Sequence, residues 1–305
     1  MISSSGTIVK GVGGFYSVDD GQQEYTLRAQ AKFRRARLTP LVGDRVCFES
    51  DGKEGWVTQI LPRQNALLRP PVANLDALVL VLAASAPAPD LLLFYNRPVG
   101  LRIDPKGLFT DQMLARAQNI PVRLVVNKAD ENPAYARELV AAYRGAGVSP
   151  MAVSARTGAG VDALKEALRG LDHAFSGQSG AGKSTLINAL YGFSLETGAL
   201  SGRVERGKHT TRHCEMIRAN GGHVFDTPGF SLLELPLTEP LRLKEGYPEF
   251  APYEGACRFA ECAHLREPGC ALRAAVEAGE VDAGRYERYQ ILFEEMKTRW
   301  KERYD

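Results

Sequence analysis

Residues 177–185 read Gly177-Gln178-Ser179-Gly180-Ala181-Gly182-Lys183-Ser184-Thr185 and match the phosphate-loop pattern G-x-x-x-x-G-K-[ST] without a mismatch. A short strand-like stretch, 173–176, precedes the loop, and a helical stretch, 186–190, follows it. In this context the glycines let backbone N–H groups turn inward around a phosphate, and the helix N-terminus adds positive potential. We therefore predict a nucleotide site with Lys183 at the β- and γ-phosphates and the Ser184 hydroxyl on Mg²⁺.

Residues 127–130, which read N-K-A-D, indicate which base this nucleotide carries. They follow the apolar stretch 122–126, and a carboxylate at a strand end can accept both N1–H and the exocyclic amine of guanine. Adenine lacks that pair of donors, so a buried Asp130 would stay unpaired against it. Asn127 can bond the base edge, and the Lys128 stem can pack along the ring. Alone the tetrapeptide is typical of a strand-end turn, but beside a phosphate loop it favours GTP and contradicts an ATPase.

Two motifs at other strand ends complete a guanine-nucleotide site. Residues 154–156, Ser-Ala-Arg, resemble the supporting motif whose backbone N–H approaches guanine O6. Residues 226–229, Asp-Thr-Pro-Gly, resemble the motif in which a carboxylate holds Mg²⁺ through water and a glycine N–H meets the γ-phosphate. The residues predicted to bind GTP are Asn127, Lys128, Ala129, Asp130, Ser154, Ala155, Gly177, Gln178, Ser179, Gly180, Ala181, Gly182, Lys183, Ser184, Thr185, Asp226 and Gly229.

The segment 207–211, Gly-Lys-His-Thr-Thr, resembles a switch I loop, in which a threonine senses the γ-phosphate and Mg²⁺. We assign that magnesium role to Thr211, together with Ser184. Phe230 stands where signalling GTPases place the glutamine that orients the attacking water. Because an aromatic ring cannot orient a water molecule, another residue must act, and His209 is the nearest polar candidate. A solvated surface histidine is an equal alternative for His209.

The order of these motifs differs from that of Ras-like proteins, in which the phosphate loop comes first. Here N-K-A-D and S-A-R precede the phosphate loop and D-T-P-G ends the set, so the GTPase region is circularly permuted. Apolar runs alternate with helical stretches from about residue 75 to residue 235, which predicts a mostly parallel sheet covered on both faces. This α/β domain ends just past switch II, so motion there would pass directly to the following domain.

Short β-like runs broken by glycines fill residues 6–60 and predict a small barrel or sandwich. Among them, residues 27–37 form a dense basic stretch that carries one aromatic residue, Phe33. Taken alone, a charge run is more often a solvated loop. On a small barrel, however, cations can neutralise phosphates and an aromatic ring can stack on a base. The candidate RNA contacts are Arg34, Arg35 and Arg37.

Four residues near the end of the chain have the spacing C-x₄-C-x-H-x₅-C, namely Cys257, Cys262, His264 and Cys270. Four sulfur and nitrogen ligands suffice for a closed tetrahedral zinc site, which has no open position for a catalytic water. Unrelated thiols are the alternative, but the close spacing favours one structural Zn²⁺. A polar, helical tail follows at 283–304.

The composition limits the classes of protein that remain. The 305 residues suggest two or three domains, and a net charge of +2 does not by itself indicate a nucleic-acid partner. The most apolar run, 77–84, is too short to cross a bilayer, which takes about 20 residues, and no signal peptide begins the chain. Five cysteines, with three of them clustered, favour a reducing compartment. We therefore expect a monomeric, cytoplasmic protein with no membrane partner.

Taken together, the motifs resemble the ribosome small-subunit-dependent GTPase family of the RsgA type. The resemblance rests on Pro-Leu-Val-Gly-Asp at 40–44, the permuted guanine-nucleotide motifs and the cysteine–histidine cluster. It implies an OB-fold RNA-binding domain over 1–70, a circularly permuted GTPase domain over 71–240 and a zinc-binding domain with helices over 241–305. The segment 94–110 departs from the family pattern but touches no motif.

The resemblance also implies a function. It implies action in late maturation of the small (30S) ribosomal subunit, binding to 16S rRNA, and hydrolysis of GTP to GDP and phosphate with stimulation by the subunit. In this family a histidine just before the switch I threonines is proposed as catalytic, and His209 occupies that place. The competing interpretation is a signalling or scaffolding switch, in which the barrel and the zinc module bind protein. Stimulation of GTP turnover by purified small subunits would distinguish the two.

Overall fold

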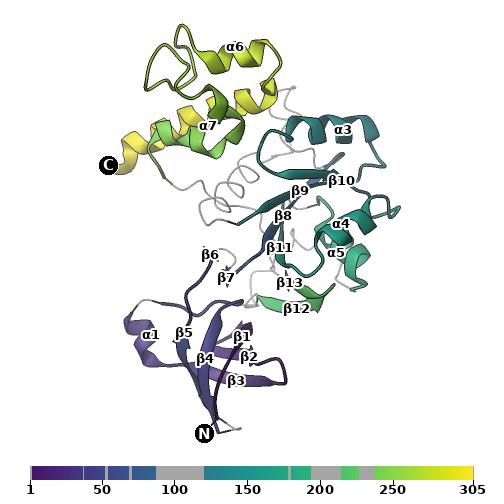
Figure 1. The fold of residues 1–305 in the computed structure, drawn as a ribbon, viewed down its shortest axis with the longest axis vertical. Helices are drawn as coiled ribbons and strands as arrows, with labels where there is room; N and C mark the ends of the chain where they lie inside the picture. Colours follow the sequence, from purple (N-terminus) through teal and green to yellow (C-terminus); the bar gives the residue numbers. More distant parts are fainter. Residues whose placement is uncertain are drawn as a thin grey trace, which may run out of the picture.

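The computed structural model describes residues 2–36, 38–51, 54–68, 71–86, 120–177, 180–193, 214–226 and 237–304. The first part of the chain forms β1 (Ile2–Val12), β2 (Phe15–Asp19), β3 (Glu24–Ala29), α1 (Ala31–Arg35), β4 (Arg45–Ser50) and β5 (Gly55–Ile60). These strands close into a barrel, at the lower end of the molecule in Figure 1, because β1 pairs with both β2 and β4 while β3 and β5 run parallel. The closed five-stranded barrel confirms the OB-fold and excludes the sandwich.

A mostly parallel sheet occupies the middle of the molecule (Figure 1). Its elements are β8 (Ala77–Ala83), β9 (Val122–Asn127), α3 (Pro133–Ala142), β10 (Ser149–Ala152), α4 (Val161–Ala167), β11 (Asp172–Gly177), α5 (Lys183–Tyr191), β12 (Glu215–Ala219) and β13 (Gly222–Asp226). The strand order is β10-β9-β8-β11-β13-β12, with only β12 antiparallel to its neighbour among these described strands. This arrangement confirms the predicted parallel sheet.

The central strand β8 is built from a continuous apolar run, and its position in the sheet explains why. All seven of its residues are buried. Leu78 and Leu80 belong to the core that includes α3, whereas Val79 and Val81 belong to the core that includes α4 and α5. Because side chains alternate between the two faces of a strand, a strand covered by helices on both faces needs apolar residues at every position.

The barrel and the central sheet are joined edge to edge. β1 pairs with β12 at one register position, Lys10↔Glu215, and this pairing links eleven strands into one sheet. Two ion pairs reinforce the junction, from Lys10 to Glu215 at 2.8 Å and from Arg218 to Asp19 at 2.6 Å. The first pair is about half exposed on both sides, so it contributes little to stability on its own. The junction therefore combines a single registered backbone pair with these two ion pairs.

The motif at 40–44 lies where the barrel meets the hairpin of β6 (Ala66–Leu68) and β7 (Pro71–Ala73). Gly43 has a φ of 92°, and a Cβ at this position would lie 2.1 Å from the carbonyl oxygen of Ala73. Asp44 is fully buried and accepts two hydrogen bonds from Arg63, at 2.7 and 2.8 Å. Gly43 therefore lets the backbone of this motif lie close to the backbone of Ala73. The buried ion pair between Asp44 and Arg63 holds the motif in that position.

The end of the chain forms a separate helical module, at the upper end of Figure 1. Its elements are η2 (Pro240–Gly246), η3 (Pro248–Tyr253), α6 (Ala271–Glu277), α7 (Ala283–Lys301) and η4 (Glu302–Tyr304). Asp282 caps α7 by accepting the N–H of Arg285 at 2.8 Å. The core of the module includes Phe250, Leu272 and Tyr289.

Arg285 connects this module to the GTPase region. Its side chain is buried and forms an ion pair with Glu249. The guanidinium carbon lies 4.8 Å from the ring centroid of Tyr143, just after α3, and 5.1 Å from that of Tyr247. A buried arginine between two aromatic rings makes cation–π contacts with both. The contact between the two regions is therefore specific rather than a loose linker.

Among the described helices, none combines the length and the apolar character that a bilayer crossing needs. The segment 94–110 lies outside the described residues. The limits proposed for the three domains stay predictions.

Candidate nucleotide site and metal centre

The predicted nucleotide motifs lie together at one edge of the central sheet. N-K-A-D begins at the last residue of β9, Ser154 follows β10, the phosphate loop begins at the last residue of β11, and Asp226 ends β13. These strands run parallel, so their carboxyl ends meet at the same edge. Ligands of open parallel sheets bind in the crevice outside this edge. The fold thus brings four motifs from distant parts of the chain to one place.

Asn127 joins three of these loops. Its Nδ2 donates to the carbonyl oxygen of Ala181 at 3.0 Å, and its Oδ1 accepts the N–H of Ala155 at 3.0 Å. The residue is buried, with 2% of its surface exposed. The amide therefore holds the phosphate loop against the loops expected to surround the base. The sequence suggests a direct bond from Asn127 to the base edge, whereas here both ends of the amide meet backbone groups.

Two glycines of the phosphate loop are required by close contacts. Gly177 has a φ of 138°, and a Cβ there would lie 2.2 Å from the carbonyl oxygen of Val81. Gly182 has a φ of 87°, and its Cβ would lie 2.5 Å from Nδ2 of Asn127. Both φ values favour glycine. Lys183, the first residue of α5, places its Nζ 2.6 Å from the carbonyl oxygen of Gly177, so the ammonium group lies over the loop.

Asp130 is held in its ionised form. Arg156 forms an ion pair with this carboxylate, whose side chain is 15% exposed. A hydrogen bond from Ser154 and the Arg156 guanidinium lower the pKa of Asp130 against the opposing effect of burial. An ionised carboxylate presents only acceptors, as recognition of two guanine donors requires. The pattern S-A-R did not reveal Arg156 as this counter-ion, because the pairing depends on the approach of two separate loops.

Those of the other predicted GTP contacts that the structure describes lie along the same edge of the sheet. Lys128 donates to the carbonyl oxygen of Ala86 at 2.5 Å, and the N–H of Ala129 donates to the carbonyl oxygen of Val153 at 3.0 Å. Gly180 precedes α5, whose first turn contains Ser184 and Thr185. Outside the described residues lie Gln178, Ser179, His209, Thr211, Gly229, Phe230 and Arg37.

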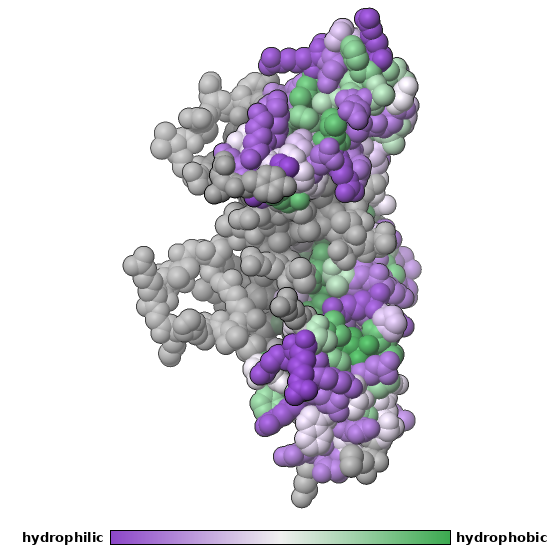
Figure 2. Space-filling view, turned by 90° about the vertical axis from the view of Figure 1, so that its left-hand side faces the viewer, coloured by the Kyte–Doolittle hydropathy of each residue, from purple (hydrophilic) through white to green (hydrophobic). Residues whose placement is uncertain are grey.

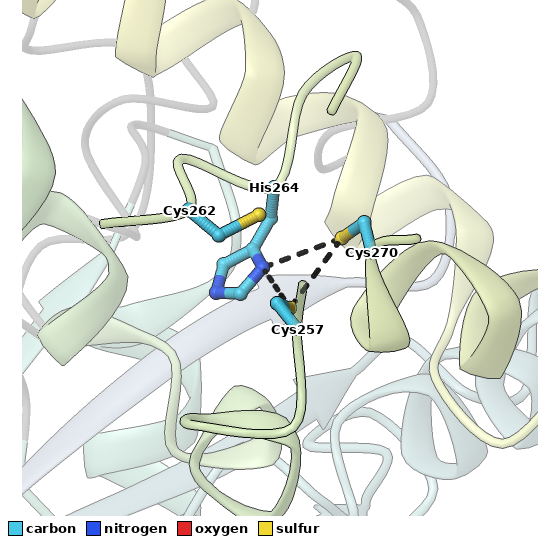
Figure 3. Close-up of side chains that lie close together, drawn as sticks. All are labelled: Cys257, Cys262, His264 and Cys270. Carbon is cyan, nitrogen blue, oxygen red and sulfur yellow. Dashed lines mark hydrogen bonds between the residues drawn. The ribbon is translucent and has the colours of Figure 1, made fainter. Parts of the chain in front are cut away.

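The four predicted metal ligands converge in the C-terminal module (Figure 3). The ligand atoms of Cys257, Cys262, His264 and Cys270 all lie within 4.8 Å of one another. Cys257 Sγ lies 3.9 Å from Cys270 Sγ, and His264 Nδ1 lies 3.5 and 3.4 Å from these two sulfurs. A tetrahedral zinc ion with usual bond lengths would set these separations at about 3.8 Å and about 3.5 Å. The donor set therefore fits one structural Zn²⁺.

The surroundings of the cluster orient its ligands. His264 Nε2 lies 3.4 Å from a carboxylate oxygen of Glu254, and the N–H of Ala271 donates to Cys257 Sγ at 3.3 Å. A histidine that binds metal through one nitrogen usually has a carboxylate or carbonyl on the other. Burial raises the pKa of the Cys262 thiol to about 12, so a cation is needed to stabilise its thiolate. The spacing pattern alone did not indicate Glu254.

The basic stretch predicted to contact RNA is partly helical. Arg34 and Arg35 are exposed on α1, but Phe33 is only 7% exposed and lies in the barrel core. The prediction that Phe33 could stack on a base is wrong, because the helix turns this ring inward. Large exposed aromatic residues of the barrel lie elsewhere, at Phe15 and Trp56.

Comparison with protein families gives two matches. Residues 5–57 match the family described as RsgA N-terminal domain, and residues 103–236 match the family described as RsgA GTPase. A protein of Ruminiclostridium cellulolyticum named Small ribosomal subunit biogenesis GTPase RsgA is 42% identical, over 96% of this chain and 93% of its own. A protein of the same name from Geobacillus kaustophilus is 40% identical, over 99% of this chain and 100% of its own.

Solved structures show the same architecture. YjeQ from Thermotoga maritima superposes with a TM-score of 0.77 at 30% identity, over 97% of this chain and 99% of its own. YloQ, described as a circularly permuted GTPase, superposes with a TM-score of 0.74 at 30% identity, over 98% of this chain and 96% of its own. The similarity therefore covers the barrel, the permuted central region and the C-terminal module together.

Proposed function

The chain belongs to the RsgA GTPase family, and on that premise we propose that it hydrolyses GTP as a factor in biogenesis of the small ribosomal subunit. Relatives that match nearly the whole chain are named for this role, which supports the proposal. In its finer form, the proposal is that the chain acts late in maturation of the 30S subunit. It binds 16S rRNA there and hydrolyses GTP to GDP and phosphate faster on the subunit than alone.

The observation that carries the proposal is the pair of hydrogen bonds made by Asn127. Its amide bonds the phosphate loop at Ala181 and the loop of Ala155, each at 3.0 Å. These bonds, made within the protein itself, hold the phosphate-binding and base-binding loops together at one sheet edge. Such preorganisation lowers the cost of binding and supports a guanine-nucleotide site built from motifs in permuted order.

Within this site each residue has a distinct task. Lys183 holds the β- and γ-phosphates as a point charge, and the N–H of Gly229 meets the γ-phosphate. Ser184 and Thr211 would hold Mg²⁺, with Asp226 acting through a water molecule. Mg²⁺ bound with GTP neutralises the negative charge that develops on the phosphates during transfer.

We assign orientation of the attacking water to His209, because Phe230 cannot orient it. His209→Ala should leave GTP affinity nearly unchanged. It should lower the subunit-stimulated kcat by roughly 10²–10⁴-fold, the usual contribution of one positioned proton-transfer group. Steady-state GTP turnover on purified small subunits, which gives kcat and KM, with GTP affinity measured separately, checks this expectation.

His223→Gln is the matched control for His209→Ala. His223 Nδ1 lies 2.8 Å from a carboxylate oxygen of Asp172. His223 is the second residue of β13, so it lies at the end of the sheet opposite the edge that carries the nucleotide motifs. This variant should keep stimulated turnover. An effect of His209→Ala on KM alone would show that His209 only binds, and full stimulated turnover would remove it from catalysis.

The RNA partner would be engaged first through charge. Arg34 and Arg35 on α1, with Arg37, neutralise phosphates of 16S rRNA, and one structural zinc keeps the C-terminal module folded beside the GTPase region. We infer a monomer that works in the cytoplasm with no membrane partner. GTP and GDP are its small-molecule ligands.

The proposed function is tested by measuring GTP turnover with and without purified small subunits. Large subunits at the same concentration are the control for nonspecific RNA. We expect small subunits alone to raise turnover. Equal stimulation by both subunits would contradict the proposed role, and stimulation by an RNA-free protein extract would indicate a signalling switch instead.

A further inference from the structure

Three exposed side chains form one transverse row across the outer surface of the barrel. Phe15 on β2 is the register partner of Arg28 on β3, and Arg28 is the partner of Trp56 on β5. Phe15 and Trp56 are 44% and 42% exposed, whereas the neighbouring Leu27 and Val57 are buried. Neighbouring strands lie about 4.8 Å apart. The row therefore presents two aromatic rings and a guanidinium on one face, over about 10 Å.

Arg28 extends the aromatic surface of this row. Its guanidinium carbon lies 4.7 Å from the ring centroid of Phe15, within the range of a cation–π contact. Across the described part of the chain, no ion pair joins Arg28 to a carboxylate. Within the described residues its N–H donors therefore remain available to a ligand, and its flat face can stack on a base as the rings can.

The charges around the row favour a polyanion. α1 begins only a few residues after Arg28, so the first turn of that helix lies within about 10 Å of it. α1 exposes Lys32, Arg34 and Arg35. Acidic residues also lie on this face: Glu49 on β4 lies opposite Trp56, and Glu24 lies on the same face of β3 as Arg28, at the first residue of that strand. Figure 2, which faces the side of the molecule that carries α1, shows strongly hydrophilic residues gathered over the barrel.

We propose that Phe15, Arg28 and Trp56 form a stacking platform for unpaired bases of RNA, with α1 neutralising the adjacent phosphates. The proposal rests on the proposed RNA partner and adds that part of the RNA bound by the barrel is single-stranded. The ring faces of a duplex are covered by its own stacking, so only splayed bases can lie on Phe15 or Trp56. Stacking on aromatic side chains is tolerant of sequence because every base has a flat face.

The chain offers a direct probe, because it has two tryptophans. Trp300 lies on α7 in the C-terminal module, under the guanidinium of Arg303 at 3.9 Å. In full-length protein carrying Trp300→Phe, the fluorescence of Trp56 reports on the row alone. An unstructured RNA of about 12 nucleotides, within the usual site size of such a fold, should quench this fluorescence. The same strand annealed to its complement should bind several-fold more weakly.

Substitutions separate stacking from charge. Phe15→Leu should weaken binding of the single strand about 5- to 150-fold, the range for one base–aromatic contact. It should not change the slope of log K against log salt concentration. The double variant Arg34→Ala and Arg35→Ala should flatten that slope, because fewer counterions are released. Trp56→Tyr should retain most of the affinity, since it keeps an aromatic face; because this variant lacks the reporting tryptophan, its binding is followed by the anisotropy of a fluorescently labelled strand.

Phe259→Leu is the matched control. Phe259 is 46% exposed and has Arg258 5.7 Å from its ring, but it lies in the C-terminal module outside any such row. Equal losses from Phe15→Leu and Phe259→Leu would overturn the platform. Equal affinity for single strand and duplex would overturn it too. Unchanged affinity of a folded Phe15→Leu variant would have the same meaning. If small subunits failed to raise the GTP turnover of the native chain, the proposed function would be contradicted. That result would not bear on whether the row binds single-stranded RNA.

Discussion

Replacing Asp130 with asparagine is expected to change the preferred nucleotide from GTP to xanthosine triphosphate. The carboxylate accepts two N–H donors from guanine, whereas an asparagine amide offers one acceptor and one donor. Xanthine carries a carbonyl oxygen where guanine carries its exocyclic amine, so xanthine complements the amide. A site built to hydrogen-bond one group rejects the mismatched analogue by about 10⁴-fold. The ratio of GTP affinity to xanthosine triphosphate affinity should therefore fall by about that factor.

Competition between the two nucleotides for a site loaded with a fluorescent GTP analogue measures this ratio. Asp162→Asn makes the same chemical change at an exposed position in the first turn of α4 and should leave the ratio unchanged. Arg156→Gln removes the counter-ion of Asp130 but keeps both carboxylate acceptors, so it should retain the preference for GTP. An Asp130→Asn variant with native GTP affinity would contradict the assignment of Asp130 to the base.

Removal of zinc should unfold the C-terminal module while the barrel and the central sheet stay folded. Cys262 and Cys270 share one core with Phe250, Leu272 and Tyr289, so metal binding and packing form one cooperative event. Zinc contributes about 10–16 kcal/mol in small zinc modules, as much as the whole stability of an ordinary domain. Cys262→Ser, or a strong chelator, should therefore release one zinc per chain and abolish the helical signal of α6 and α7.

Elemental analysis and circular dichroism on the full chain measure the two losses together. Cys47→Ser is the matched control, because Cys47 lies on β4 of the barrel, outside the cluster. It should keep both the zinc and the helical signal. A native chain that purifies without zinc would contradict the metal assignment, and retention of zinc and helix in Cys262→Ser would do the same.

The fold and the location of the site were predictable where a pattern is local. The continuous apolar run of β8 and the glycines of the phosphate loop act over a few residues, so the sequence shows them directly. Gly177 and Gly182 each face a contact that leaves no room for a Cβ. The cysteine–histidine spacing likewise places four ligand atoms within 4.8 Å of one another.

Features that depend on contacts between distant segments were not predictable. Asn127 bonds backbone groups 54 and 28 residues away, so its role as a tie between loops requires the folded sheet. Arg156 meets Asp130 across 26 residues for the same reason. The inward orientation of Phe33 is not visible in the sequence, because five residues of helix are too few to show which face of α1 turns inward.

The junction of β1 with β12 also affects how the molecule meets other copies of itself. An unpaired strand edge can recruit a strand from another chain and start aggregation. Here β1 meets β12 at one register position, Lys10↔Glu215, so it covers only one end of that strand's edge. At the far side of the large sheet, β10 is an edge strand. β10 is four residues long and contains Pro150, which has no N–H to offer an incoming strand. The described edge strand β10 is therefore short and interrupted by proline, which disfavours pairing with a strand of another copy at this side of the sheet.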